Sequence, residues 1–394
     1  MTTAESVYIV AARRTPIGAF QGVLAPLTAP QLGAAAVRGA LERSGVSGEQ
    51  VDEVLLGCVL PAGLGQAPAR QAALGAGIPA RVPATTINKV CGSGMKAAMI
   101  GCDAIRAGSA RVVVAGGLES MTNAPYLLPK ARSGYRMGHG EVLDHMFYDG
   151  LQNPYDGALM GHFADITARK YGFSRAEQDA FAAESVRRAL LASESGAFGA
   201  ELVAVTVKSR KGEQVVDRDE PPYNCDLEKI PQLKPAFAKD GTVTAASSSS
   251  IADGAAALVL MSDSAMRAAG STPLARVVAY ASHAHEPEWF TTAPAGAIQR
   301  ALKLASWRSQ DVDLYEINEA FAVVTMAAMR DVDLPHEKVN VNGGACALGH
   351  PIGASGARIM TTLVHALRSR KLQRGVASLC IGGGEATAIA LELA

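Results

Sequence analysis

The feature that most constrains the fold is a regular alternation of short apolar runs with amphipathic stretches. Glycines follow the two helical stretches at Gly45 and Gly108, as expected where helices end. This alternation predicts an α/β fold with a covered sheet. The predicted elements are strands at 7–11, 51–59 and 111–115, and helices at 30–44 and 95–107.

A similar order of elements returns near the C-terminus. A strand that runs into glycines occurs at 111–117 and again at 376–384. We therefore predict a duplicated five-stranded α/β unit whose halves share a layer of helices. The alternative is two ordinary α/β domains without a common origin. The later elements are strands at 274–280, 314–317, 376–381 and 386–393, and helices at 293–305 and 353–367.

A proline-rich segment with charged helices interrupts the first unit at 121–250 and predicts an inserted, loop-rich domain. The expected organisation is an N-terminal half of 1–120 plus 251–271, the insert, and a C-terminal half of 272–394. The serines at 247–250 precede an apolar run at 254–259 that we interpret as a helix. They would either lie in a solvated loop, cap that helix or bind a polar group of a ligand.

Composition excludes several classes of function. Lys+Arg and Asp+Glu are both 37, so no basic field favours nucleic acid or an anionic membrane surface. No apolar run is long enough for a transmembrane helix, and no signal peptide is expected. The six cysteines form no C-x-x-C pair, so we predict free thiols in the cytoplasm and no metal site.

Cys91 is the candidate nucleophile. It precedes Gly92-Ser93-Gly94 and a predicted helix. A helix N-terminus lowers the pKa of a thiol and presents free N–H groups to an oxyanion. The alternative is a buried cysteine in a tight turn.

Other polar residues lie in comparable settings. His350 is held between Gly349 and Pro351, and its ordinary pKa suits proton transfer near neutrality. Cys380 is followed by Ile381 and three glycines. Asn318 follows a predicted strand, where it would either hold a water or carbonyl oxygen or cap a helix.

Together these motifs resemble the thiolase family, and within it the acetyl-CoA C-acetyltransferases, over essentially the whole length. The resemblance implies a duplicated five-layer αβαβα core with an inserted loop domain. It also implies a homodimer or a homotetramer assembled through 121–146. The matching segments are 90–95 (VCGSGM), 116–121 (GGLESM), 318–321 (NEAF), 342–345 (NGGA), 349–353 (GHPIG) and 380–384 (CIGGG).

The resemblance implies reversible Claisen condensation of two acetyl-CoA to acetoacetyl-CoA and CoA. Cys91 would accept the acyl group with His350 as base, and Cys380 would remove a proton from C2 of the second acetyl-CoA. One oxyanion hole would use His350 and a water held by Asn318. The other would use the N–H groups of Cys91 and Gly382. CoA is substrate and product, and no cofactor is implied.

The resemblance also implies the residues that contact CoA. Leu159 stands where short-chain members usually have histidine, and 221–224 read Pro-Pro-Tyr-Asn where Tyr and Arg are usual. We expect from this a raised Michaelis constant for CoA with ordinary acetyl specificity. The implied contacts are Leu151, Met160, Phe237, Ala245, Ser249 and Phe321.

Three other functions remain open at this point. A degradative 3-ketoacyl-CoA thiolase shares the chemistry and accepts longer chains. A ketoacyl synthase would lack the second reactive cysteine of a Cys-x-Gly motif, which Cys380 supplies. A non-catalytic acyl-CoA binding protein would lack at least one of the catalytic residues.

Overall fold

The main sheet consists of two halves that repeat the same strand order. The computed structural model describes residues 5–209 and 212–394. The N-terminal half has the order β4-β3-β5-β10-β1, in which β3 pairs in parallel with β4 and β5 and the remaining pairs are antiparallel. Its strands are β1 (Val7–Arg14), β3 (Glu53–Gly57), β4 (Ala84–Ile87), β5 (Val112–Ser120) and β10 (Ala252–Ser262), and the short β2 (Gly18–Ala19) pairs with β10.

The C-terminal half has the order β12-β13-β14-β11, with one parallel pair followed by two antiparallel pairs. Val339 adds a parallel bridge to Tyr315 of β12, in the place that β4 takes in the first half. The halves meet where β1 and β11 pair over two residues. These strands are β11 (Ala275–Ala284), β12 (Leu314–Ile317), β13 (Arg374–Ile381) and β14 (Glu385–Leu393).

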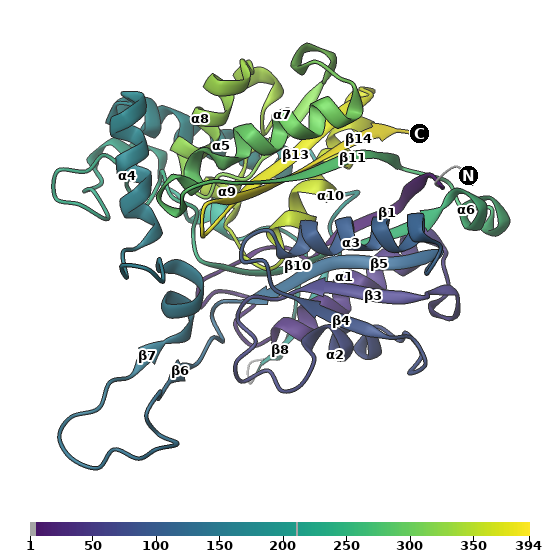
Figure 1. Cartoon of the computed structure of the whole chain (residues 1–394), viewed down its shortest axis with the longest axis horizontal. Coiled ribbons are helices and arrows are strands. Elements are labelled where there is room, and N and C mark those ends of the chain that lie inside the picture. The colour runs from purple at the N-terminus through teal and green to yellow at the C-terminus, as the bar shows by residue number, and fades with distance from the viewer. Residues whose placement is uncertain (1–4, 210–211) are drawn as a thin grey trace.

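Helices complete five layers, as predicted. Buried residues of α1 (Ala29–Ser44) and α2 (Pro68–Gly75) pack on the outer face of the N-terminal sheet. Residues of α7 (Ala293–Ala305) and α8 (Ala322–Val332) do the same on the C-terminal sheet. The central layer contains α3 (Ser93–Ala107) and α10 (Ser355–Arg370), which share one core with both sheets. Figure 1 shows α10 between the two halves of the sheet.

Glycines at the start of the two central helices let α3 and α10 come into close contact. A Cβ on Gly94 would lie 2.9 Å from the backbone nitrogen of Ala357, and one on Gly356 would lie 2.4 Å from that of Met95. No larger side chain fits at these distances. The close approach brings the segments that precede both helices, and hence Cys91 and His350, to the same end of the core.

The predicted helix at 254–259 is wrong, because these residues belong to β10. This strand lies between β5 and β1 and is buried throughout, so its sequence shows no alternation that would separate a strand from a buried helix. The glycines after the strand predicted at 111–115 also do not end it. β5 continues to Ser120, and a Cβ on Gly116 would lie 2.1 Å from the carbonyl oxygen of Ala256.

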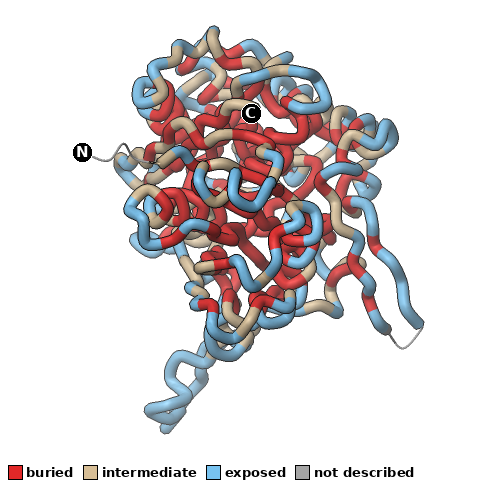
Figure 2. The backbone as a smooth tube through the Cα atoms, turned by 90° about the vertical axis from the view of Figure 1, so that its right-hand side faces the viewer, coloured by how far each residue is buried: buried red, intermediate tan, exposed pale blue. Residues whose placement is uncertain are grey.

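The segment between β5 and β10 packs partly against this core and partly projects from it. The loop between β6 and β7 forms an exposed arm (Figure 1), and Figure 2 shows buried backbone concentrated in the body of the molecule. Among the described residues, no helix is long and apolar enough to span a bilayer. The segment contains β6 (Tyr126–Leu127), β7 (Leu143–Asp144), α4 (Met160–Tyr171), α5 (Arg175–Glu194), β8 (Val205–Ser209) and β9 (Gly212–Val216); α6 (Asp263–Ala269) and α9 (Ala345–Leu348) complete the fold.

Candidate active site

Cys91 lies in a strained turn between β4 and α3. Val90 before it has φ of 45°, a left-handed conformation that is rare for a β-branched residue. Ser93 fixes this turn, because its hydroxyl donates to the carbonyl of Val90 at 2.6 Å and accepts from the N–H of Lys89 at 2.8 Å. Strain that is held by surrounding contacts is typical of functional sites.

The thiol of Cys91 is not ionised by its helix, contrary to the sequence-based expectation. Burial raises the pKa of Cys91 to about 11, although the N–H groups of Gly382 and of Cys91 itself act in the opposite direction. Desolvation therefore outweighs these local donors. A nucleophile in this state needs a base beside it.

His350 is the candidate for that base, because it lines the same pocket as Cys91. Its backbone N–H donates to the carbonyl of Ser250 at 3.0 Å, and its Nδ1 lies 2.6 Å from the hydroxyl of Ser355 and 3.4 Å from Nδ2 of Asn318. Burial, and then the charge of Arg358, lower the pKa of His350 to about 3, so the ring is neutral. Its Nε2 has no hydrogen-bond partner among the described residues, and the residue lines the main pocket.

Cys380 is the second thiol at this pocket. It occupies the next-to-last position of β13, paired with Ala386, and Gly382 follows in the turn to β14. Burial raises the pKa of Cys380 well above its ordinary value, and the charge of Cys91 acts in the same direction. Ionisation of Cys380 therefore depends on the state of Cys91.

One pocket contains most of the predicted site. Its apolar wall includes Phe147 and Phe290 as well as predicted residues, and Leu159 also lines it. Phe237 and Phe321 meet edge to face with ring centroids 5.9 Å apart. Nine of the eleven predicted site residues line the pocket, namely Cys91, Leu151, Met160, Phe237, Ser249, Phe321, His350, Cys380 and Gly382.

The other two predicted residues lie elsewhere. Asn318 is fully buried behind His350 and reaches the pocket only through its contact with the imidazole. Ala245 lines a separate hollow that also contains Asn224 and Lys229. The main pocket and this hollow share only Ile251, so the structure does not place Ala245 beside the thiols.

Sequence reasoning missed the buried polar residues behind the site. The carboxylate of Glu119 accepts from the N–H groups of Val59, Leu60 and Gly353 at 2.9–3.2 Å. Ser355 contacts the His350 ring. Glu119 lies in the segment 116–121 and Ser355 follows 349–353, so the motifs themselves were the available signal. The part of the chain that the structure describes contains no group of acidic, histidine or cysteine side chains able to hold a metal ion.

Comparisons with known proteins identify the family. The model of the thiolase N-terminal domain matches residues 7–264, and that of the C-terminal domain matches 271–393. The acetyl-CoA acetyltransferases of Pseudomonas aeruginosa and Escherichia coli are each 51% identical, over 98% of this chain and 99% of theirs. A crystal structure of the Bacillus anthracis acetyl-CoA acetyltransferase superposes with a TM-score of 0.98 at 43% identity, with all of both chains covered. The chain belongs to the thiolase family and is an acyltransferase.

Proposed function

We propose that this protein catalyses the reversible condensation of two acetyl-CoA to acetoacetyl-CoA and CoA. The observation that carries the proposal is the meeting of Cys91, His350 and Cys380 at one apolar pocket. The relatives named acetyl-CoA acetyltransferases support the choice of substrate. Acyl-CoA and CoA are thus the small-molecule partners, and the chemistry requires no cofactor.

In the first half-reaction, Cys91 attacks the thioester carbonyl of acetyl-CoA. Nε2 of His350 accepts the thiol proton, and the hydroxyl of Ser355 can accept from Nδ1–H while it donates to the carbonyl of Pro351 at 3.0 Å. The N–H groups of Cys91 and Gly382 stabilise the oxyanion. The departing CoA thiolate takes a proton from Cys380, which leaves acetyl-Cys91, imidazolium and a Cys380 thiolate.

In the second half-reaction, the Cys380 thiolate removes a proton from C2 of another acetyl-CoA. Acetylated Cys91 can no longer take up a negative charge, which would oppose ionisation of Cys380. Protonated His350, with a water held by Asn318, stabilises the enolate oxygen. The enolate attacks acetyl-Cys91, acetoacetyl-CoA forms, and the released Cys91 thiolate recovers its proton from His350.

Labelling separates the two thiols. Brief exposure to radiolabelled acetyl-CoA and peptide mapping should place the label on Cys91. Cys380→Ala should still exchange acyl groups but should almost stop condensation. Cys346→Ala, which changes a cysteine outside the main pocket, should leave both half-reactions at their normal rates. A label on Cys380 alone, or equal loss of both half-reactions in Cys380→Ala, would overturn the assignment.

Chain-length assays distinguish the proposal from a degradative thiolase of broader range. Met160, Phe290 and Phe321 are bulky residues at the pocket wall, so we expect acetoacetyl-CoA to be preferred over longer substrates. Each added methylene that does not fit costs about 1–3 kcal/mol. A preference for an eight-carbon ketoacyl-CoA would support the alternative.

The contacts with the remainder of CoA are also proposals. Leu159 borders the acyl pocket and Asn224 borders the hollow that contains Ala245. Neither supplies a cation, so we expect a raised Michaelis constant for CoA. Leu159→His or Asn224→Arg should lower it with little change in turnover; tight CoA binding by the unaltered chain would contradict this.

The organisation of the whole protein follows the same resemblance. We propose a cytoplasmic homodimer or homotetramer, with the insert at 121–250 used for CoA binding and assembly. Tyr126, Leu128 and Met137 are exposed apolar residues on the arm and support this role. Light scattering that shows only monomer would contradict it. The flanking halves, 1–120 plus 251–271 and 272–394, are supported by their common strand order.

A further inference from the structure

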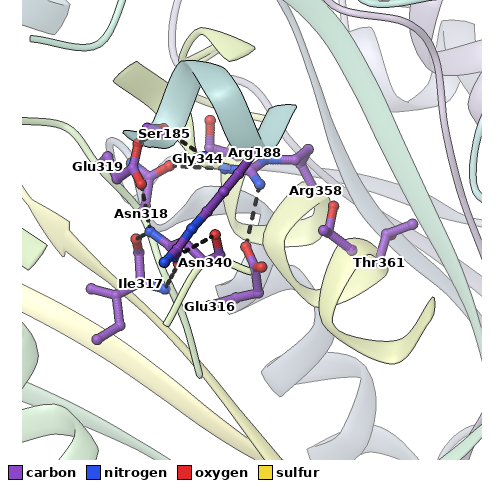
Figure 3. Close-up of polar contacts among 12 residues, drawn as sticks. Ser185, Arg188, Glu316, Ile317, Asn318, Glu319, Asn340, Gly344, Arg358 and Thr361 are labelled. Carbon is purple, nitrogen blue, oxygen red and sulfur yellow. Dashed lines mark hydrogen bonds and ion pairs between the residues drawn. The ribbon is translucent and has the colours of Figure 1, made fainter. Parts of the chain in front are cut away.

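A buried arginine lies directly behind the catalytic pocket. Arg358 of α10 is 2% exposed, and its Nη2 donates to Oδ1 of Asn318 at 3.4 Å. Its Nη1 lies 3.5 Å from Oε2 of Glu316, which is equally buried. Figure 3 shows this group at the edge of a larger polar network that includes Asn340 and Glu319.

The arginine determines which way the Asn318 amide points. A guanidinium can only donate, so the amide must turn its oxygen toward Arg358 and its NH₂ group away. In that orientation Nδ2 lies 3.4 Å from Nδ1 of His350. A flipped amide would place its NH₂ against a cation and its oxygen beside the imidazole. Because Nδ1 of His350 carries the proton that Ser355 accepts, the imidazole alone would favour the flipped amide, and Arg358 is the contact that favours the observed one.

The same cation acts on His350 electrostatically. Burial is the main cause of the low pKa of His350, and the charge of Arg358 is the second. The guanidinium itself faces Glu316, Glu201 and Glu319, and also the cation of Arg14. Cys91 and Cys380 are the titratable groups that share the pocket with the imidazole.

We propose that Arg358 is a positioning residue of the condensation half-reaction, which fixes the orientation of the Asn318 amide and places a cation on the far side of that amide from His350. The inference rests on the proposed roles of Cys91, His350 and Asn318. It assigns Arg358 no contact with substrate. Its two effects, orientation and charge, can be separated by substitution.

Two substitutions separate them. Arg358→Lys keeps a cation but not the guanidinium, whereas Arg358→Met removes both. Because Arg358→Met leaves the buried carboxyl of Glu316 without its partner cation, this substitution is also combined with Glu316→Gln. At pH 8, both variants should acylate Cys91 at nearly the normal rate. Both should lose roughly 10- to 100-fold in exchange of the C2 protons of acetyl-CoA with D₂O, because the enolate loses an oriented donor.

The pH profile of acylation reports the charge. In the unaltered protein and in Arg358→Lys, the acylation rate should decline only below pH 5, since the pKa of His350 is about 3. In Arg358→Met, with or without Glu316→Gln, the decline should move to higher pH but stay below the ordinary histidine pKa of about 6.5, because burial, the larger cause, remains. A general structural defect would not move this profile in one variant and leave it in the other.

Controls decide the outcome. Arg188→Met alters another arginine of the same network, which donates to the carbonyls of Val339 and Asn340, and should change neither readout. In an Asn318→Ala background, Arg358→Lys should cause little further loss of exchange, because it acts through that amide. Additive losses, equal loss of acylation and exchange at pH 8, or the same pattern in Arg188→Met would overturn the inference. Failure of the unaltered protein to acylate Cys91 would instead overturn the proposed function.

Discussion

Replacing Glu119 by glutamine should change how the stability of the protein depends on pH. Glu119 lies in β5, where it is fully buried and accepts from three backbone N–H groups. One of these belongs to Gly353, in the turn that follows His350, and the other two belong to the loop after β3. The carboxylate therefore ties two loops of the active site to the sheet. Glutamine has nearly the same shape and cannot ionise.

The sign and size follow from the pKa. Burial raises the pKa of Glu119 from 4.5 to about 7, because the N–H donors only partly offset desolvation. The folded state thus favours the protonated acid, and this contribution to stability declines as pH rises through 7. Between pH 5 and 8.5 the difference amounts to about 2.5 kcal/mol. Glutamine avoids this decline but leaves at least one N–H without an acceptor, which costs about 1–3 kcal/mol.

Equilibrium unfolding by denaturant, followed by tryptophan fluorescence from pH 5 to 8.5 at one protein concentration, measures both terms. The unaltered protein should be the more stable at pH 5, and its advantage should shrink or reverse by pH 8.5. Glu119→Ala supplies an internal control. It should be less stable than Glu119→Gln at every pH, but its stability should depend on pH in the same way as that of Glu119→Gln, because neither side chain ionises. A difference between the unaltered protein and Glu119→Gln that does not vary with pH would refute the reasoning.

Four further substitutions, one of them a control, test the geometry. Gly117→Ala places a Cβ 2.0 Å from the carbonyl oxygen of Gly353, so condensation should be lost through displacement of the His350 turn. The control Gly45→Ala changes a helix end with open space around it; it should lower the free energy of unfolding by about 1–2 kcal/mol and keep full activity in steady-state assays. Met160→Ala should raise the kcat/KM for 3-ketopentanoyl-CoA relative to acetoacetyl-CoA roughly tenfold, and an unchanged ratio would exclude Met160 from the acyl wall. Ser355→Ala removes the 2.6 Å partner of Nδ1 in His350 and should slow the acyl-enzyme burst roughly 10- to 100-fold, whereas a normal burst would show that the imidazole needs no such support.

Most of the fold could be predicted because its helices carry clear end signals. The helix predicted at 30–44 is α1, which begins at a capping box of Thr28 and Gln31 and ends at left-handed Gly45. Two strands were harder. β10 is buried on both faces, so its sequence contains neither period, and β4 is only four residues long.

The reacting groups could be predicted, but their environment could not. Cys91, His350 and Cys380 are marked by glycines that shape the turns around them. Whether burial or a helix dipole controls the pKa of Cys91 depends on how deeply the thiol lies, and a linear sequence does not contain that depth. Arg358 lies in the part of α10 that is buried on all sides, and its contact with Asn318 joins positions 40 residues apart.

The repeated strand order has a consequence for how the two halves can diverge. Ser120 and Ile381 each form the last pair of an antiparallel ladder, so Glu119 and Cys380 stand on equivalent rungs. The C-terminal half closes its ladder with residues 382–384, while the N-terminal half leaves the sheet for 121–251 at the same point. The part of the pocket wall that this segment supplies is thus an insertion between the ends of two adjacent strands, β5 and β10. The length and composition of this inserted segment can change without a shift in register, while Glu119 keeps the carboxyl group that holds two loops and Cys380 keeps the thiol proposed to move protons.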